Sequence, residues 1–108
     1  MFRVEHYQTP DGVDIIGNWL DGLTDHQAVA RIAARLIRLE LGNFGDCKAV
    51  NEGVWELRVD RGPGYRIYYA QAGLELIVLL CGGDKRKQKN DILRAISYWQ
   101  DWQRRSAS

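Results

Sequence analysis

Hydrophobic residues in the first half of the chain recur with the period of an α-helix. The series Val13, Ile16, Trp19, Leu20 and Leu23 predicts a first helix over residues 11–22. A capping box formed by Thr24 and Gln27 predicts the start of a second helix, which is expected to end at Gly42. Because the link between the two helices is very short, they are expected to form an antiparallel hairpin, preceded by a strand-like segment over residues 2–9.

From residue 54 the hydrophobic period changes to two, which is the period of a half-buried strand. The two faces of residues 54–60 alternate, with Trp55, Leu57 and Val59 against Glu56, Arg58 and Asp60. A turn at residues 61–64 leads to a second strand over residues 65–70, and residues 74–80 form a third strand that is apolar on both faces. A last helix is predicted from the spacing of Ile92, Ile96, Trp99 and Trp102.

These elements predict an α+β fold: an N-terminal strand, a helical hairpin, a three-stranded antiparallel meander that completes the sheet, and a C-terminal helix. One layer of sheet is expected to pack against one layer of helices. The 108 residues, 45% of them hydrophobic, are expected to form a single domain over residues 1–108. The N-terminus carries no apolar segment as long as a signal peptide or membrane span, so we expect a cytoplasmic protein without a membrane partner.

The two cysteines, Cys47 and Cys81, lie far apart and lack the spacing of a metal site. Cys81 ends an apolar strand and is therefore interpreted as a small buried residue. Asp84 and Asp91 have no third carboxylate partner in sequence and are interpreted as residues of a helix start. We expect no disulfide, no metal and no cofactor.

The net charge of +1 argues against nonspecific binding of nucleic acid, but the charges are unevenly distributed. Residues 1–54 carry five Lys or Arg against eight Asp or Glu, whereas residues 55–108 carry ten against six. Four cations, Lys85, Arg86, Lys87 and Lys89, follow Gly82-Gly83 where a strand ends and a helix is predicted to begin. Cations are unfavourable at the positive end of a helix, so this cluster indicates a bound anion such as a phosphate backbone.

Two further arginines are expected near this cluster. Arg58 and Arg66 lie in neighbouring strands joined by one tight turn, and Glu56 shares the face of Arg58. If the register turns both arginines outward, they form a cationic pair on one face of the sheet. The alternative is that each arginine forms an ordinary surface salt bridge with Glu56 or Asp60, which would contribute little to stability.

Three separated motifs resemble the RelE/ParE toxin superfamily, and within it the HigB-type, phage Gp49-like addiction module killer proteins. They are Gly53-Val54-Trp55-Glu56-Leu57-Arg58, then Gly62-Pro63-Gly64-Tyr65-Arg66-Ile67-Tyr68-Tyr69, then Gly82-Gly83-Asp84-Lys85 with Gln88 and Asp91-Ile92. The resemblance covers nearly the whole chain. It implies a toxin of a type II toxin–antitoxin pair that enters the ribosome and cuts mRNA. A helix-turn-helix antitoxin would neutralise it, and the toxin would contact operator DNA only through that antitoxin.

The resemblance also implies roles for individual residues. RelE-type toxins keep a basic residue in the first of these strands, which Arg58 matches, and an arginine in the next strand, which Arg66 matches. A further basic residue follows the last strand, where Lys85 or Lys87 is the equivalent. RelE itself has a tyrosine where Asp91 lies in this chain.

Other members use a histidine near this end of the sheet, whereas His6 and His26 both lie in the N-terminal part of this chain. The identity of the general acid and base therefore stays open.

Metal-free cleavage of RNA uses the ribose 2′-hydroxyl as nucleophile, and it needs a base, a proton donor and cations on the phosphate. Arg58 and Arg66 suit the phosphate, because a guanidinium binds it through two hydrogen bonds and stays charged. The base is sought among Lys85, Lys87, Glu56 and Asp91, with the two lysines favoured. The residues expected to contact RNA are Glu56, Tyr68, Arg86, Gln88, Lys89 and Asp91.

Three further groups of residues have alternative interpretations. Either Tyr68 or Tyr69 is expected to face outward and stack on a base, although packing in the core is the commoner role of such residues. Trp99 and Trp102 are interpreted as core residues or as a surface that the antitoxin covers. The stripe of Arg31, Arg35 and Arg38 is interpreted as a solvated helix face, with contact to ribosomal RNA as the alternative.

Two other functions remain open at this point. A ParE-like poison of DNA gyrase would cut no RNA and would tolerate the loss of Arg58 and Arg66 together. A catalytically inactive module would only hold its antitoxin.

Overall fold

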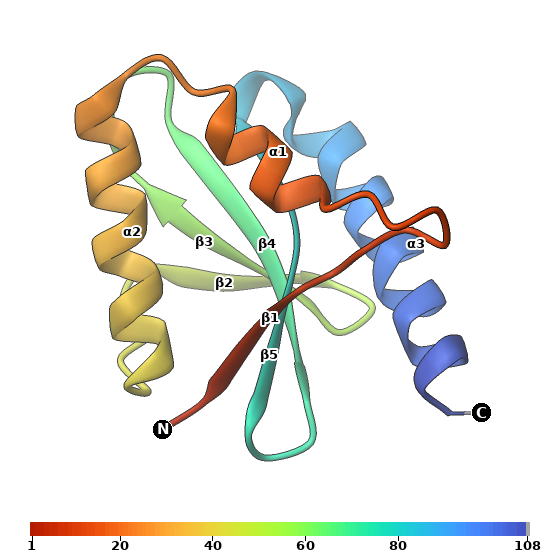
Figure 1. Ribbon diagram of the computed structural model, residues 1–108. Helices are drawn as coiled ribbons and strands as arrows, with labels where there is room; N and C mark the ends of the chain where they lie inside the picture. The colour runs from red at the N-terminus through yellow and green to blue at the C-terminus, as the bar shows by residue number, and fades with distance from the viewer. Residues whose placement is uncertain (108) are drawn as a thin grey trace.

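The computed structural model describes residues 1–107 and contains a five-stranded sheet with helices on both faces (Figure 1). The elements are β1 (Arg3–His6), α1 (Ile15–Asp21), α2 (His26–Glu40), β2 (Cys47–Asn51), β3 (Val54–Val59), β4 (Tyr65–Ala72), β5 (Leu76–Asp84), the 3-10 turn η1 (Lys85–Lys87) and α3 (Gln88–Ser106). The strand order is β1-β5-β4-β3-β2. Strand β1 pairs in parallel with β5, and the other neighbours are antiparallel, which confirms the predicted α+β class.

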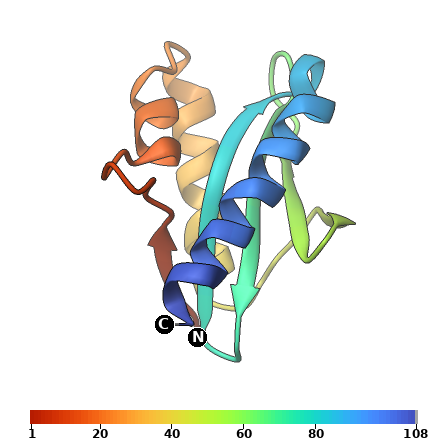
Figure 2. The same cartoon turned by 90° about the vertical axis from the view of Figure 1, so that its right-hand side faces the viewer.

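Helices cover both faces of the sheet, not one as expected from the sequence. Helices α1 and α2 lie on one side and α3 on the other (Figure 2). The core is accordingly divided in two. Leu57, Ile67 and Ile77 pack beneath α1 and α2, whereas Val54, Ala70 and Val78 pack beneath α3. Strand β5 lies between both layers, which explains why its sequence is apolar on both faces.

The meander has four strands because Cys47–Asn51 forms an additional strand, β2, along β3. Its residues alternate poorly in hydrophobicity and its burial is shallow, so the period of the sequence did not indicate it. Strand β5 also differs from the expected range of residues 74–80. It begins at Leu76 and continues through Gly82-Gly83 to Asp84, so Cys81 lies within the strand. Cys81 is buried, as expected, and burial raises the pKa of its thiol to about 12.

The starts of α1 and α2 differ from the expectations in a common way, because an aspartate caps each of these two helices. Helix α1 begins at Ile15 and not near residue 11, with Asp14 accepting a hydrogen bond from the Gly17 amide. Helix α2 is capped by Asp25, whose carboxylate accepts from two backbone amides, and not by the predicted capping box of Thr24 and Gln27.

Arg35 is not part of a solvated face. Its guanidinium donates to the carbonyl oxygens of Arg58 and Phe44 at 2.5 and 3.1 Å, and thereby joins α2 to β3 and to the loop before β2. Arg31 and Arg38, the other two residues of the predicted stripe, are exposed. The stripe is divided because α2 packs on the sheet with Arg35 at the border of the contact.

Replacing Arg35 with alanine is expected to lower the free energy of unfolding by about 2–4 kcal/mol, since it leaves carbonyl oxygens without their charged donor. Arg38→Ala on the exposed side of the same helix is the matched control and should change it by less than about 0.5 kcal/mol. Urea unfolding of both variants measures the difference, and equal midpoints would contradict this role of Arg35.

Candidate nucleic-acid interface

Arg58 and Arg66 face each other directly across two neighbouring strands. They form a register pair between β3 and β4, and Gly83 of β5 is the next residue across the sheet. Both side chains lie on the face that α3 covers in part. The sequence predicted that the two arginines form a pair if the strand register turns both to the same face, and the register of β3 and β4 does so.

A buried carboxylate lies between the two arginines. Glu56 is fully buried, and its Oε1 atom lies 3.4 Å from Arg66 Nε and 4.0 Å from Arg58 Nε. Its other oxygen, Oε2, accepts a hydrogen bond of 2.6 Å from the amide of Gln88, the first residue of α3. Glu56 was expected on an open polar face, but α3 closes over that face. It therefore holds the two guanidinium groups and the start of α3 together, and it is shielded from solvent.

A second carboxylate pairs with Arg58 at the surface. Asp46, in the loop before β2, lies 3.0 Å from Arg58 Nη2 and is exposed. This contact was not predicted, because Asp46 belongs to a segment that was not expected to reach β3. A phosphate that binds Arg58 has to compete with Asp46, whereas no surface carboxylate within residues 1–107 forms an ion pair with Arg66.

The predicted cation cluster forms a 3-10 turn between β5 and α3. Asp84 caps this turn and also pairs with Arg86 at 2.9 Å, so one of the four cations is already neutralised. The hydrogen bonds from Arg86 keep the pKa of the Asp84 carboxyl below its ordinary value. Lys85, Lys87 and Lys89 are exposed and form no ion pair within the part of the chain that the structure describes.

Lys85 lies beside the arginine pair. The amide of Lys85 donates to the carbonyl oxygen of Gly64, which fixes the 3-10 turn against the loop between β3 and β4. A methyl group added at Gly64 would lie 3.4 Å from Lys85 Cδ and 3.7 Å from Arg66 Nη1, so both side chains border the same glycine. Gly64 has a φ of +81°, which favours glycine at this contact. The structure thus joins the cations of β3, β4 and η1 into one surface.

Asp91 and Tyr68 lie beneath this surface and not on it. Asp91 is buried and pairs with Arg94 at 3.0 Å. Burial raises the pKa of its carboxyl despite the opposing effect of Arg94. Tyr68 is fully buried beneath α3, and burial together with Glu56 raises the pKa of its hydroxyl. Tyr69 is buried on the other face of the sheet, so neither ring is open to stack on a base, contrary to the expectation.

Within residues 1–107, the buried side-chain nitrogen and oxygen atoms that have no hydrogen-bond partner all lie in this region. They are Glu56 Oε1, Arg58 Nε, Arg66 Nε, Tyr68 Oη and Asp91 Oδ2. Such atoms are normally satisfied by ordered water. The interface therefore rests on a buried polar layer between the sheet and α3, where the rest of the core is apolar.

Gly82 and Gly83 allow two neighbouring elements to approach β5. An added Cβ at Gly82 would lie 2.4 Å from a ring carbon of Trp19 in α1, and one at Gly83 would lie 2.0 Å from Asp91 Oδ2 in α3. The two glycines thus serve opposite faces of the sheet. In the sequence, the two glycines were notable as the start of the motif Gly82-Gly83-Asp84-Lys85 and not for this close approach.

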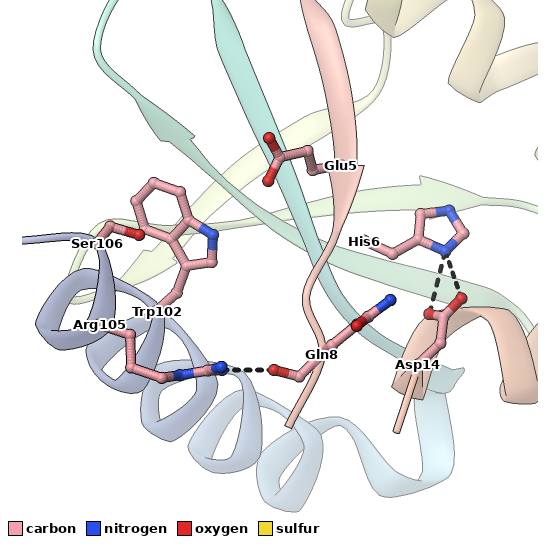
Figure 3. Close-up of a pocket in the computed structure, with 7 residues that line it drawn as sticks. All are labelled: Glu5, His6, Gln8, Asp14, Trp102, Arg105 and Ser106. Atoms are coloured by element: carbon pink, nitrogen blue, oxygen red, sulfur yellow. Dashed lines mark hydrogen bonds and ion pairs between the residues drawn. The ribbon is translucent and has the colours of Figure 1, made fainter. Parts of the chain in front are cut away.

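A separate cavity of about 620 Å³ lies at the other end of α3 (Figure 3). Its lining residues are Glu5, His6, Gln8, Asp14, Trp102, Arg105 and Ser106. His6 Nδ1 lies 3.0 Å from Asp14 Oδ2 in this cavity. Since Arg105 follows Lys87 by eighteen residues along the helix, the cavity is about 27 Å away from the cation cluster along the axis of α3. His6 therefore does not contribute to the interface.

The two tryptophans of α3 have different surroundings. Trp99 is buried beneath the helix, as a core residue is expected to be, and its ring stacks on Trp102 at a centroid distance of 5.3 Å. Trp102 is half-buried and borders the cavity.

Within residues 1–107, no group of three or more His, Cys, Asp or Glu side chains is arranged to hold a metal ion. Across the same residues, no helix combines the length and hydrophobicity needed to cross a membrane.

Comparison with known proteins identifies relatives over most of the chain. Residues 18–96 match the family described as phage derived protein Gp49-like. An uncharacterized protein of Haemophilus influenzae is 51% identical over 78 residues, which cover 72% of this chain and 79% of the relative. The matched range includes Arg58, Arg66 and the whole cation cluster. The chain belongs to the phage-derived Gp49-like family, which is a toxin-like family.

Proposed function

We propose that this protein is the toxin of a type II toxin–antitoxin pair and cuts mRNA on the ribosome without a metal ion. The observation that carries the proposal is the direct pairing of Arg58 with Arg66, with Lys85 bordering the same glycine as Arg66. Membership of a toxin-like family supports it. The resemblance of the three motifs to HigB-type members of the RelE/ParE superfamily supplies the reaction.

In the proposed reaction, the ribose 2′-oxygen attacks the adjacent phosphorus and the bond from phosphorus to the 5′-oxygen breaks. A base takes the proton of the 2′-hydroxyl, and an acid gives a proton to the leaving 5′-oxygen. Arg66 and Arg58 hold the phosphate and stabilise the charge that builds on its oxygens. Glu56 does not contact the RNA in this scheme, because it is fully buried, and it keeps the two guanidinium groups in place.

Burial reduces the candidates for the base. Glu56 and Asp91 are both buried and already paired, so neither reaches a ribose on the surface. Lys85 and Lys87 are exposed and unpaired within residues 1–107. We therefore propose that one of these two lysines exchanges the proton with the 2′-hydroxyl, while Arg86, Gln88 and Lys89 contribute to positioning the RNA.

Replacing whichever of Lys85 and Lys87 takes the proton with alanine is expected to reduce the rate of cleavage about a hundredfold or more. Lys89→Ala, which removes a neighbouring charge of the same type, should reduce it less than about fivefold. Single-turnover cleavage by Lys85→Ala, Lys87→Ala and Lys89→Ala at several pH values separates these effects. Small and equal losses in all three variants would mean that the lysines only attract RNA.

The proposed partners follow from the same scheme. The ribosome presents the mRNA and positions its phosphate, and a cognate helix-turn-helix antitoxin neutralises the toxin and connects it to operator DNA. We place the protein in the cytoplasm, where translating ribosomes are found.

Primer extension on a defined mRNA in a cell-free translation system tests the proposal. Cuts that appear only when ribosomes are present are the expected result. Uncut mRNA from a protein that still arrests growth would overturn the proposal and favour inhibition of DNA gyrase. Uncut mRNA from a protein that does not arrest growth would favour an inactive module that only binds its antitoxin.

A further inference from the structure

Helix α2 carries a second apolar stripe on its outer side. Its inner side packs on the sheet through Ala28, Ile32 and Leu39, which are fully buried. The outer stripe consists of Ala30, Ala33, Ala34 and Ile37 of the helix and of Leu41, the residue that follows its last turn, and all five are exposed. Their spacing of three and four places them along one line of the helix. In Figure 1 this side of α2 lies at the edge of the molecule, with no other element over it.

The large members of this outer stripe are unusually exposed. Ile37 is 58% exposed and Leu41 is 62% exposed, in a chain where most Ile and Leu residues are buried or half-buried. Single exposed apolar residues need no explanation, but a continuous line of them on one helix favours contact with a partner.

One border of the outer stripe is basic. Arg31 and Arg38 lie seven residues apart, so they follow the same side of the helix. Neither forms an ion pair within the described residues. A groove of about 350 Å³ runs beside them, lined by Arg31, Ala34, Arg35, Arg38, Val59 and Asp60. The other border of the stripe carries Glu40.

We propose that the outer stripe of α2 and its basic border bind an acidic amphipathic helix of a partner protein. Apolar side chains at spacings of three and four match the apolar face of a helix, and Arg31 and Arg38 would pair with carboxylates beside that face. A nucleic-acid backbone would satisfy the arginines but would leave Ile37 and Leu41 in contact with charged phosphates.

A second copy of this chain fits the same surface less well. In a two-fold antiparallel pair of α2 helices, each border faces the same border of the other copy. Arg31 and Arg38 of one copy would then face Arg38 and Arg31 of the other, and like charges at such positions repel. The charge pattern therefore favours a different, acidic partner. The identification of this partner as the antitoxin rests on the proposed function. The inference that the outer stripe binds an acidic helix does not depend on it.

The test uses the full chain and two fluorescein-labelled helical peptides of about three heptads, with Leu and Ala on one face. One peptide carries Glu on both borders, and the other carries Lys. The double variant Ile37→Ser, Leu41→Ser removes the apolar contact, and Arg38→Glu reverses the charge. Leu93→Ser and Arg104→Glu are matched controls on α3, where both side chains are also well exposed.

Fluorescence anisotropy is expected to show that the Glu peptide binds the parent chain. The double serine variant should weaken this binding about tenfold, and Arg38→Glu about fivefold, while both controls stay within twofold. The Lys peptide should bind Arg38→Glu more tightly than the parent. Equal binding of both peptides to the parent, or losses no larger than those of the controls, would overturn the proposal.

Two further measurements exclude the other occupants. A labelled RNA oligonucleotide whose binding falls with Arg38→Glu but not with the serine pair would reassign the surface to RNA. A dimer that dissociates in the serine variant on sedimentation would reassign it to a second copy. A chain that binds the Glu peptide through α2 but cuts no mRNA would overturn the proposed function and leave this surface in place. A chain that cuts mRNA while the α2 variants bind normally would overturn only this inference.

Discussion

Replacing Arg66 with alanine is expected to reduce ribosome-dependent cleavage of mRNA about a hundredfold to a thousandfold, because it removes a preorganised cation from the reacting phosphate. Arg66 is the stronger candidate of the pair, since Arg58 is also held by Asp46 at the surface. Arg66→Lys keeps the positive charge but loses the bidentate hydrogen bonding to phosphate, so its activity should lie between those of the parent and the alanine variant.

The same substitution also affects the fold, and the experiment has to separate the two effects. Removing Arg66 leaves the buried Glu56 with less compensation, at a cost of about 1–3 kcal/mol. A double variant, Arg66→Ala with Glu56→Gln, removes both charges and retains an oxygen acceptor for Gln88. Primer extension on both variants, with Arg104→Ala as a surface control, gives the comparison. Full cleavage by the folded double variant would contradict the role of Arg66.

Replacing Gly83 with alanine is expected to destabilise the protein by about 3 kcal/mol, because the new methyl group would lie 2.0 Å from Asp91 Oδ2. Gly82→Ala should have an effect of similar size through Trp19 on the opposite face. For a chain of this length, such a loss corresponds to a fall of more than about 10 °C in the melting temperature.

Gly22→Ala is the matched control for both variants. Gly22 has a negative φ, and an added Cβ would approach no atom closer than 3.5 Å. Its melting temperature should stay close to that of the parent. Thermal unfolding followed by circular dichroism measures all three variants. A melting temperature of Gly83→Ala equal to that of the control would contradict the close approach of Asp91 in α3 to Gly83 in β5.

The electrostatic core of the interface was largely predictable from the sequence. The period of two in residues 54–60 placed Arg58 on one face of a strand, and the tight turn that follows brought Arg66 within reach of it. The position of the cluster at Lys85–Lys87 was predictable because these residues directly follow the apolar run that forms the last strand. These features depend on local patterns and short connections, which the order of residues specifies.

The roles of the carboxylates were not predictable in the same way. A strand pattern states which residues share a face, but it does not state what covers that face. Helix α3 buries Glu56 and Asp91, so neither carboxylate lies on the surface at which we propose that RNA binds. Tyr68 was misplaced for the same reason, since its alternation with Tyr69 indicated one inward and one outward ring, and helices cover both.

Local patterns in the sequence were enough to predict the α+β class, the antiparallel pairing that joins Arg58 to Arg66, and the position of the cation cluster after the last strand. The packing of the layers was needed to show that Glu56 is buried between the two arginines, that Arg35 joins α2 to β3, and that Gly82 and Gly83 make room for Trp19 and Asp91. The two groups of features differ in the distance along the chain over which the responsible interactions act. Periodicity and turn chemistry act over a few residues, whereas burial and close approach depend on segments that are distant along the chain and meet only when the layers pack.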